Sequence, residues 1–153
     1  MSKTTPPFSV DKAEESPGLL LWQTTTLWQQ KIRETLKPFG VSHSQFVLMA
    51  ITLWHEVQGQ EVTQKTLLEW SKLDKMTVSG GLKHLVEKKL VSREIHPTDT
   101  RVKLVKFTSK GRKLAEKLVP AVEAVDGEFF GRLNRVVKDA LCMTLQLLTH
   151  EKK

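Results

Sequence analysis

Apolar residues recur at helical spacing over residues 18–37 and predict a first helix there. Ser16 is a suitable N-cap residue, and Pro17 fits the first helical turn. Pro38 and Gly40 follow the last apolar position and end the pattern. The polar stretch 1–15 before this helix is predicted to be a flexible N-terminal arm. The stripe consists of Leu21, Trp28, Ile32 and Leu36, with Leu20 and Leu27 beside it.

A second helix is predicted from about residue 43 to Val57, after a possible capping box of Ser42 and Gln45. Its apolar positions occupy nearly every side, which is typical of a helix buried on several faces. Gln58-Gly59-Gln60 interrupts the pattern, and a short strand is predicted at Glu61-Val62.

Residues 62–111 contain two short helical patterns followed by two strand patterns. Thr63 is predicted to cap the first helix and Asp74 the second, in which apolar residues are spaced four and three apart. Alternating β-branched positions over 91–97 and 102–107 predict a hairpin. This order predicts a winged helix-turn-helix, in which the second helix enters the DNA major groove. The expected fold class is therefore all-α with a small β-wing.

The C-terminal third is predicted to be helical. Thr108 caps a further helix, and Pro120 within its pattern predicts a kink or an earlier end. A last helix is expected from about Glu128 to His150. Its two apolar stripes exceed what one small core can cover, so we expect a second copy of the chain to cover them.

The charge distribution agrees with a DNA partner. The chain has a net charge of +7, and residues 65–113 hold 13 Lys/Arg against 5 Asp/Glu. The rest of the chain holds 11 against 12, so the whole excess lies in the predicted winged helix.

No catalytic or metal-binding pattern is visible in the sequence. The five histidines lack metal-ligand spacing, and there is neither a nucleophile motif nor a phosphate-binding glycine loop. The single cysteine, Cys142, suits a reducing compartment and is expected to be an inert core or interface residue. We therefore expect no enzyme activity and no cofactor. The N-terminus resembles no secretory signal, and no apolar run reaches the roughly 20 residues of a membrane span, so a cytoplasmic protein is expected.

Residues 16–150 resemble the MarR family of transcriptional regulators. The resemblance rests on motifs in the family's order and spacing: Gly40-Val41-Ser42-His43-Ser44-Gln45-Phe46, Val62-Thr63-Gln64-Lys65-Thr66-Leu67, Asp74-Lys75-Met76-Thr77-Val78-Ser79, and the wing from Pro97 to Gly111 with its Asp-x-Arg tip. It implies one MarR-like unit at 16–150, with dimerisation helices at 16–38 and 109–150 and a DNA-binding region at 42–107. It also implies a homodimer on a palindromic operator, often released by a small ligand, and favours a repressor.

Several polar residues are candidates for DNA contact. Lys side chains reach phosphates or guanine, and Ser and Thr reach base edges. Arg101 is predicted to enter the minor groove with Asp99 bracing its guanidinium, although the pair could serve only to hold the turn. The candidates are Lys65, Lys72, Lys75, Thr77, Ser79, Lys83, His84, Asp99, Arg101 and Lys103, with Lys106 as a further phosphate contact.

Tryptophans of the first two helices are candidates for an effector pocket. Trp22, Trp28 and Trp54 could line a cleft for a small apolar or aromatic ligand, or they could be ordinary core residues.

Four positions depart from the family pattern. Gly80 replaces a DNA-contacting polar residue, either to let the DNA backbone approach or without functional consequence. Gly81 replaces an apolar core residue, and Leu68 is expected to fill the space it leaves. Lys89 replaces a glycine, so a positive φ there would strain it by about 1 kcal/mol.

Two other functions remain open from the sequence. An architectural winged-helix protein would bind duplex DNA with little sequence preference. A winged-helix module that binds another protein would bind duplex DNA only weakly.

Overall fold

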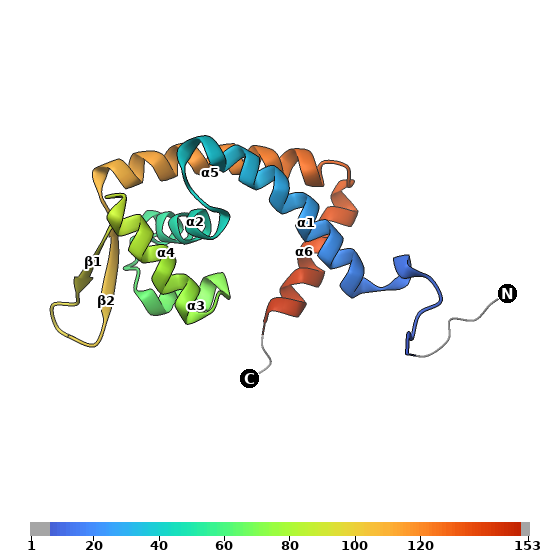
Figure 1. Cartoon of the computed structure of the whole chain (residues 1–153), viewed down its shortest axis with the longest axis horizontal. Coiled ribbons are helices and arrows are strands. Elements are labelled where there is room, and N and C mark those ends of the chain that lie inside the picture. The colour runs from blue at the N-terminus through green and yellow to red at the C-terminus, as the bar shows by residue number, and fades with distance from the viewer. Residues whose placement is uncertain (1–6, 151–153) are drawn as a thin grey trace. The chain divides into compact units, whose positions relative to one another are not determined.

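The computed structural model describes residues 7–150, so the first six residues of the predicted arm lie outside the described part. The chain divides into two compact units, Met1–His43 and Ser44–Lys153, which are described separately. Figure 1 labels the helices and strands along the chain.

The first unit is built on one long helix. Helix α1 spans Pro17–Leu36, between short 3-10 helices η1, Ala13–Glu15, and η2, Lys37–Phe39. The Ser16 hydroxyl accepts the Leu19 N–H at 3.3 Å, as the predicted cap requires. Gly40 adopts a left-handed φ of 65° where the helical segment ends.

The second unit confirms the all-α fold with a small β-wing. The two strands pair antiparallel, from Val91 opposite Phe107 to Ile95 opposite Lys103. The predicted strand at Glu61-Val62 is reduced to a Thr63–Leu104 bridge and a hydrogen bond from Val105 N–H to the Val62 carbonyl. Its elements are α2 (His43–Val57, whose first residue closes the first unit), α3 (Gln64–Ser71), α4 (Lys75–Glu87), β1 (Val91–Ile95), β2 (Lys103–Phe107), α5 (Ser109–Phe130) and α6 (Arg135–Thr149).

Local capping explains where the helices of the winged helix begin. The side chains of Thr63, Asp74 and Thr108 each accept the backbone N–H three residues further on, as predicted. Inward of these caps the helices share one core with the hairpin, consisting of Leu67, Val78, Leu82, Leu85, Val91, Leu104, Val105, Ala115 and Leu118. Because one face of α4 is fixed in this core, its opposite face points outward.

Two lysines adopt left-handed backbone conformations. Lys89 has a φ of 60°, which confirms the strain expected where the family has glycine. Lys72, at the C-cap of α3, has a φ of 59°, which the sequence did not indicate. Each costs roughly 1 kcal/mol, which the surrounding packing must offset.

Helix α5 continues through Pro120 to Phe130, so the predicted earlier end is wrong. Proline removes one intrahelical hydrogen bond, but Leu118 and Val122 on either side of it are buried and hold the helix in place. The last helix consequently begins later than predicted, at Arg135 after the Asn134 cap.

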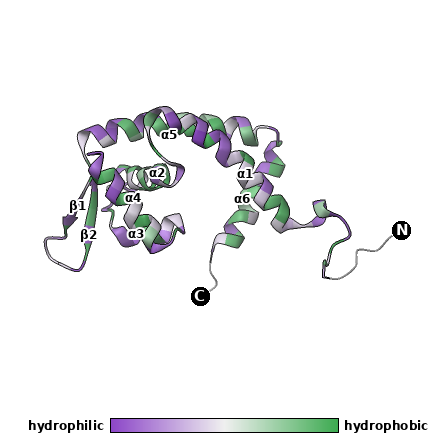
Figure 2. Cartoon of the chain, viewed as in Figure 1, coloured by the Kyte–Doolittle hydropathy of each residue, from purple (hydrophilic) through white to green (hydrophobic). Residues whose placement is uncertain are grey.

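Helix α6 has no buried residue. Figure 2 shows apolar and polar segments following one another along its ribbon. Val136, Val137, Met143, Leu147 and Leu148 are exposed on it. None of the helices formed by the described residues combines the length and apolar character that a bilayer span requires.

Three glycines of this unit differ in the room they have for a side chain. A Cβ at Gly111 would overlap the Leu90 carbonyl oxygen, whereas a Cβ at Gly80 would meet nothing within 4 Å. A Cβ at Gly81 would lie 2.9 Å from Leu48 Cδ1. The expectation that Leu68 fills the space at Gly81 is therefore wrong, because Leu48 occupies it.

Gly111→Ala should lower the free energy of unfolding by at least about 2 kcal/mol, because the added methyl collides with backbone that cannot rotate away. Gly80→Ala should raise it by up to about 1 kcal/mol, because alanine is the better helix former and open space is available. Urea unfolding of both variants checks the pair. An unchanged midpoint for Gly111→Ala would contradict the close approach.

Candidate nucleic-acid interface

The outward face of α4 carries the groups available to a ligand of the winged helix. Lys75 and Lys83 are exposed, Ser79 and Gly80 are half-buried, and Met76 is 86% exposed. Lys75 and Lys83 make no ion pair with a carboxylate within the described residues, so their charges are free to attract an anion. Helical spacing places Met76, Ser79, Gly80 and Lys83 along one side of α4.

The hydroxyl of Thr77 is already engaged. It donates to Asp74 Oδ2 at 2.6 Å, while the Thr77 N–H donates to Asp74 Oδ1 at 2.8 Å. These two hydrogen bonds lower the pKa of Asp74, so the stability they add is present at neutral pH and is lost as the pH falls through that lowered value. Thr77 can therefore accept a hydrogen bond from DNA but cannot donate this proton, and its contact with DNA stays a prediction.

At the wing tip the Asp99 carboxylate holds Arg101. Arg101 Nε and Nη2 lie 3.1 and 3.3 Å from Asp99 Oδ1 and Oδ2, and the Arg101 N–H donates to Oδ1 at 3.1 Å. The side-chain and then the backbone hydrogen bonds of Arg101 lower the pKa of Asp99. The predicted brace is confirmed, and the Arg101 side chain is 89% exposed in its braced position.

The wing is tied to the loop before α3 and across its own strands. His96 Nε2 lies 3.5 Å from a Glu61 carboxylate oxygen, and His96 Nδ1 accepts the Thr98 N–H at 3.2 Å. Lys106 pairs with Glu94 on the opposite strand at 3.3 Å. A contact between Lys106 and phosphate would have to compete with this pair.

A groove lies between the start of α3, the start of α4 and the wing. Its lining contains four of the predicted DNA-binding cations and no carboxylate, although Arg101 is paired with Asp99 and Lys65 lies 3.9 Å from Glu69, both just outside the lining. Lys75 and Lys103 have no carboxylate partner within the described residues, so the groove keeps an excess of positive charge that attracts an anion. The lining residues are Thr63, Gln64, Lys65, Leu68, Lys75, Arg101, Val102 and Lys103.

The other predicted contacts lie outside this groove. Lys72 caps α3 at its C-terminus, and Ser79 and Lys83 lie further along α4. His84 faces Glu87 one turn on, at 3.6 Å, so its positive charge is partly countered when it is protonated.

Sequence reasoning missed two residues of this surface. Gln64 Oε1 is buried without a hydrogen-bond partner within the described residues, and it belongs to a residue that lines the groove. Met76 is exposed on α4. Its exposure could have been predicted from the sequence, because Met76 lies outside the apolar stripe of Val78, Leu82 and Leu85. The signal for Gln64 was weaker, because a glutamine after a threonine cap usually faces solvent.

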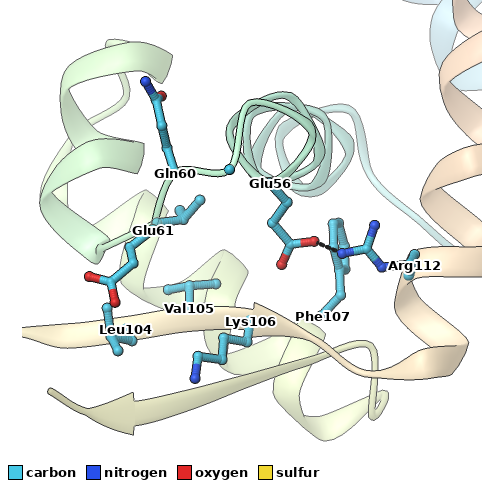
Figure 3. A pocket seen from close by; sticks show the side chains of 10 residues that line it. Glu56, Gln60, Glu61, Leu104, Val105, Lys106, Phe107 and Arg112 are labelled. Carbon is cyan, nitrogen blue, oxygen red and sulfur yellow. Dashed lines mark hydrogen bonds and ion pairs between the residues drawn. The ribbon is translucent and has the colours of Figure 1, made fainter. Parts of the chain in front are cut away.

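Residues of α2 and α5 lie beside strand β2, on the side away from β1. Figure 3 shows the Glu56 carboxylate of α2 directed at the Arg112 guanidinium of α5, with Phe107 of β2 beside them. The Glu56 side chain is only 18% exposed, so this ion pair is partly shielded from water. It joins the helices on either side of the cavity lined by β2 and the loop 59–62.

The tryptophans suggested for an effector pocket belong to different units. Trp22 is exposed on α1, and Trp28 on the same helix packs edge-on against the His43 ring at a centroid distance of 5.1 Å. Trp54 is exposed on α2 in the second unit. A pocket that uses them stays a prediction. Cys142 is exposed on α6, so it is no core residue within a single chain.

Comparison with known proteins assigns the fold to a family. Residues 37–125 match the model of the ArnR1-like winged-helix domain. The chain is 36% identical over 137 residues to the uncharacterized HTH-type transcriptional regulator YdcH of Bacillus subtilis, covering 89% of this chain and 92% of YdcH. The chain belongs to the MarR family of transcriptional regulators.

Two solved structures show what this family's fold does elsewhere. BpsR of Bordetella bronchiseptica, whose DNA binding is regulated by 6-hydroxynicotinic acid, is 26% identical with a TM-score of 0.81, covering 92% of this chain and 98% of BpsR. A mutant MarR of Escherichia coli complexed with operator DNA is 25% identical with a TM-score of 0.74, covering 88% and 95% of the two chains. This MarR-family chain is accordingly a DNA-binding transcriptional regulator and not an enzyme.

Proposed function

We propose that this MarR-family regulator binds a palindromic operator as a homodimer and represses transcription until a small molecule releases it. The observation that carries the DNA-binding part is the groove between α3, α4 and the wing, whose lining holds four cations, two of them without a carboxylate partner within the described residues. Four cations converge there beside the exposed face of α4, and a polyanion is the ligand that such an arrangement favours.

On this proposal the DNA contacts divide by type. Helix α4 lies in the major groove, where Ser79 and Lys83 reach base edges and Thr77 accepts a hydrogen bond. Arg101 enters the adjacent minor groove, held in shape by Asp99. The phosphate contacts are Lys65, Lys72, Lys75, His84, Lys103 and Lys106.

The dimer is supported by apolar surface on both terminal helices. Helix α6 exposes Val136, Met143 and Leu148, and α1 exposes Leu21 and Trp22. Helix α6 has no buried residue within one chain. Exposed apolar patches of this kind are typical of surfaces that bind another protein chain. A second copy provides the cover, and its two-fold symmetry accounts for the palindrome.

Release by an effector is supported by the relative BpsR and by the exposed tryptophans of α1 and α2. The rings of Trp22 and Trp54 are exposed and Trp28 is half-buried, and each is a flat apolar group of the kind that a small aromatic molecule packs against. An effector that binds the DNA-incompetent state more tightly would shift the population away from the operator.

Selection from random duplex DNA tests the proposal. An enriched palindrome is expected, and affinity for it should fall roughly 10³–10⁵-fold between 50 and 200 mM salt if about 6–10 phosphates are contacted. Binding without sequence preference would favour the architectural alternative. Weak binding that does not respond to salt would favour a protein-binding module.

Light scattering at micromolar concentration should give about twice the chain mass of 17.4 kDa. Leu148→Asp should give a folded monomer. Leu148 is 72% exposed within one chain, so the change should not disturb the fold of that chain. In the dimer it would bury an unpaired charge between the two copies. Circular dichroism of that variant should match the wild type. A wild-type monomer that binds the selected DNA tightly would overturn the dimer.

Arg101→Ala should weaken binding to the selected operator by roughly 1–3 kcal/mol and relax any preference for A·T-rich flanks. Titration of labelled duplexes at fixed salt measures both effects. Arg132→Ala is the matched control, because Arg132 is an exposed arginine outside the winged helix. Equal losses in both variants would mean that only net charge matters and would remove the wing from the interface.

A further inference from the structure

The most exposed large apolar residue among those described is Met76, one position into the recognition helix α4. Its side chain is directed away from the core that buries Val78, Leu82 and Leu85. An apolar side chain held in water at this position gains nothing for the fold, because burial is what makes such groups stabilising.

The neighbours of Met76 indicate what kind of ligand covers it. The exposed apolar residues of α6 lie among other exposed apolar residues, as expected of a surface for another protein chain. Met76 instead lies among polar positions, the N-cap Asp74, Lys75, Ser79 and Lys83, of which the two lysines have no carboxylate partner within the described residues. A surface of this charge favours a polyanion, so the apolar group that Met76 meets is part of a nucleic acid.

Space is available beside Met76. Gly80 follows it by four residues and therefore lies one turn along the same side of α4. A Cβ at Gly80 would meet nothing within 4 Å, so the surface is open at this point. Met76 therefore projects from α4 beside a position that has room for a side chain and carries none.

The major groove offers one apolar group, the C5-methyl of thymine. A methionine thioether is flexible and polarizable, which suits contact with a small methyl group at a surface. We propose that Met76 contacts the methyl group of one thymine in each operator half-site and that Gly80 leaves room for that base pair. This inference rests on the proposed function, because it requires α4 to lie in the major groove.

Deoxyuridine scanning tests the inference. Each thymine of the selected operator is replaced in turn by deoxyuridine, which removes only the methyl group and keeps the base pair. At one thymine per half-site, wild-type affinity should fall about 3- to 5-fold, the loss expected from one apolar methyl contact. With Met76→Ala the same replacement should have almost no effect, while other positions behave as in the wild type.

Two conservative variants and one control sharpen the test. Met76→Leu should keep most of the methyl dependence, and Met76→Gln should lose it. Val57→Ala removes an exposed apolar side chain at the end of α2, outside α4, and should leave every duplex unaffected. Because Met76 is so exposed, its variants should unfold at the wild-type urea concentration, which separates binding from folding.

The space at Gly80 has its own readout. Gly80→Ala should bind the thymine-containing site several-fold more weakly, although its unfolding midpoint rises. Unchanged affinity would overturn the part assigned to Gly80.

Failure of the inference is distinguishable from failure of the proposed function. Absence of any enriched site would reject the proposed function. An enriched site on which deoxyuridine has the same effect in the wild type and Met76→Ala would reject the Met76 contact alone.

Discussion

The junction between β2 and α5 is the constraint on which the winged helix depends. The Thr108 hydroxyl donates to the Lys89 carbonyl at 2.6 Å, and the Thr108 N–H donates to the Leu90 carbonyl at 3.0 Å. The same hydroxyl accepts the Gly111 N–H at 3.0 Å and so starts α5. Gly111 lies so close to Leu90 that any side chain would overlap its carbonyl. The end of β2 is thereby fastened to the turn that follows α4, which closes the hairpin at its base and sets where the wing lies relative to α4.

Local signals in the sequence predicted the parts of this arrangement that depend on near neighbours. The caps at Thr63 and Asp74 act over three residues, and the Asp99–Arg101 brace acts over two. Each could be predicted from residue type and spacing alone, and each is present. The left-handed Lys89 was indicated by the family resemblance instead, because the family has a glycine at this position.

Contacts between distant segments could not be predicted in this way. The space at Gly81 is taken by Leu48, which is 33 positions earlier in the chain, so nothing near Gly81 indicated the partner. Helix α5 continues through Pro120 with Leu118 and Val122 buried on either side, and the local rule that proline ends a helix takes no account of such packing. The burial of the Gln64 oxygen without a partner within the described residues depends on the three-dimensional packing around α3, which the sequence alone does not give.

The arrangement of α4 limits how it can recognise a sequence. The Thr77 proton is committed to Asp74, and Gly80 offers no side chain at all. On the proposed interface, hydrogen-bond readout by α4 is then left mainly to Ser79 and Lys83. Fewer hydrogen-bonding groups give less discrimination per base pair, because each good polar contact supplies only about 1–3 kcal/mol. The remaining discrimination must come from groups that recognise methyl groups or groove width, and an exposed methionine on α4 and a braced arginine at the wing tip are groups of those two kinds.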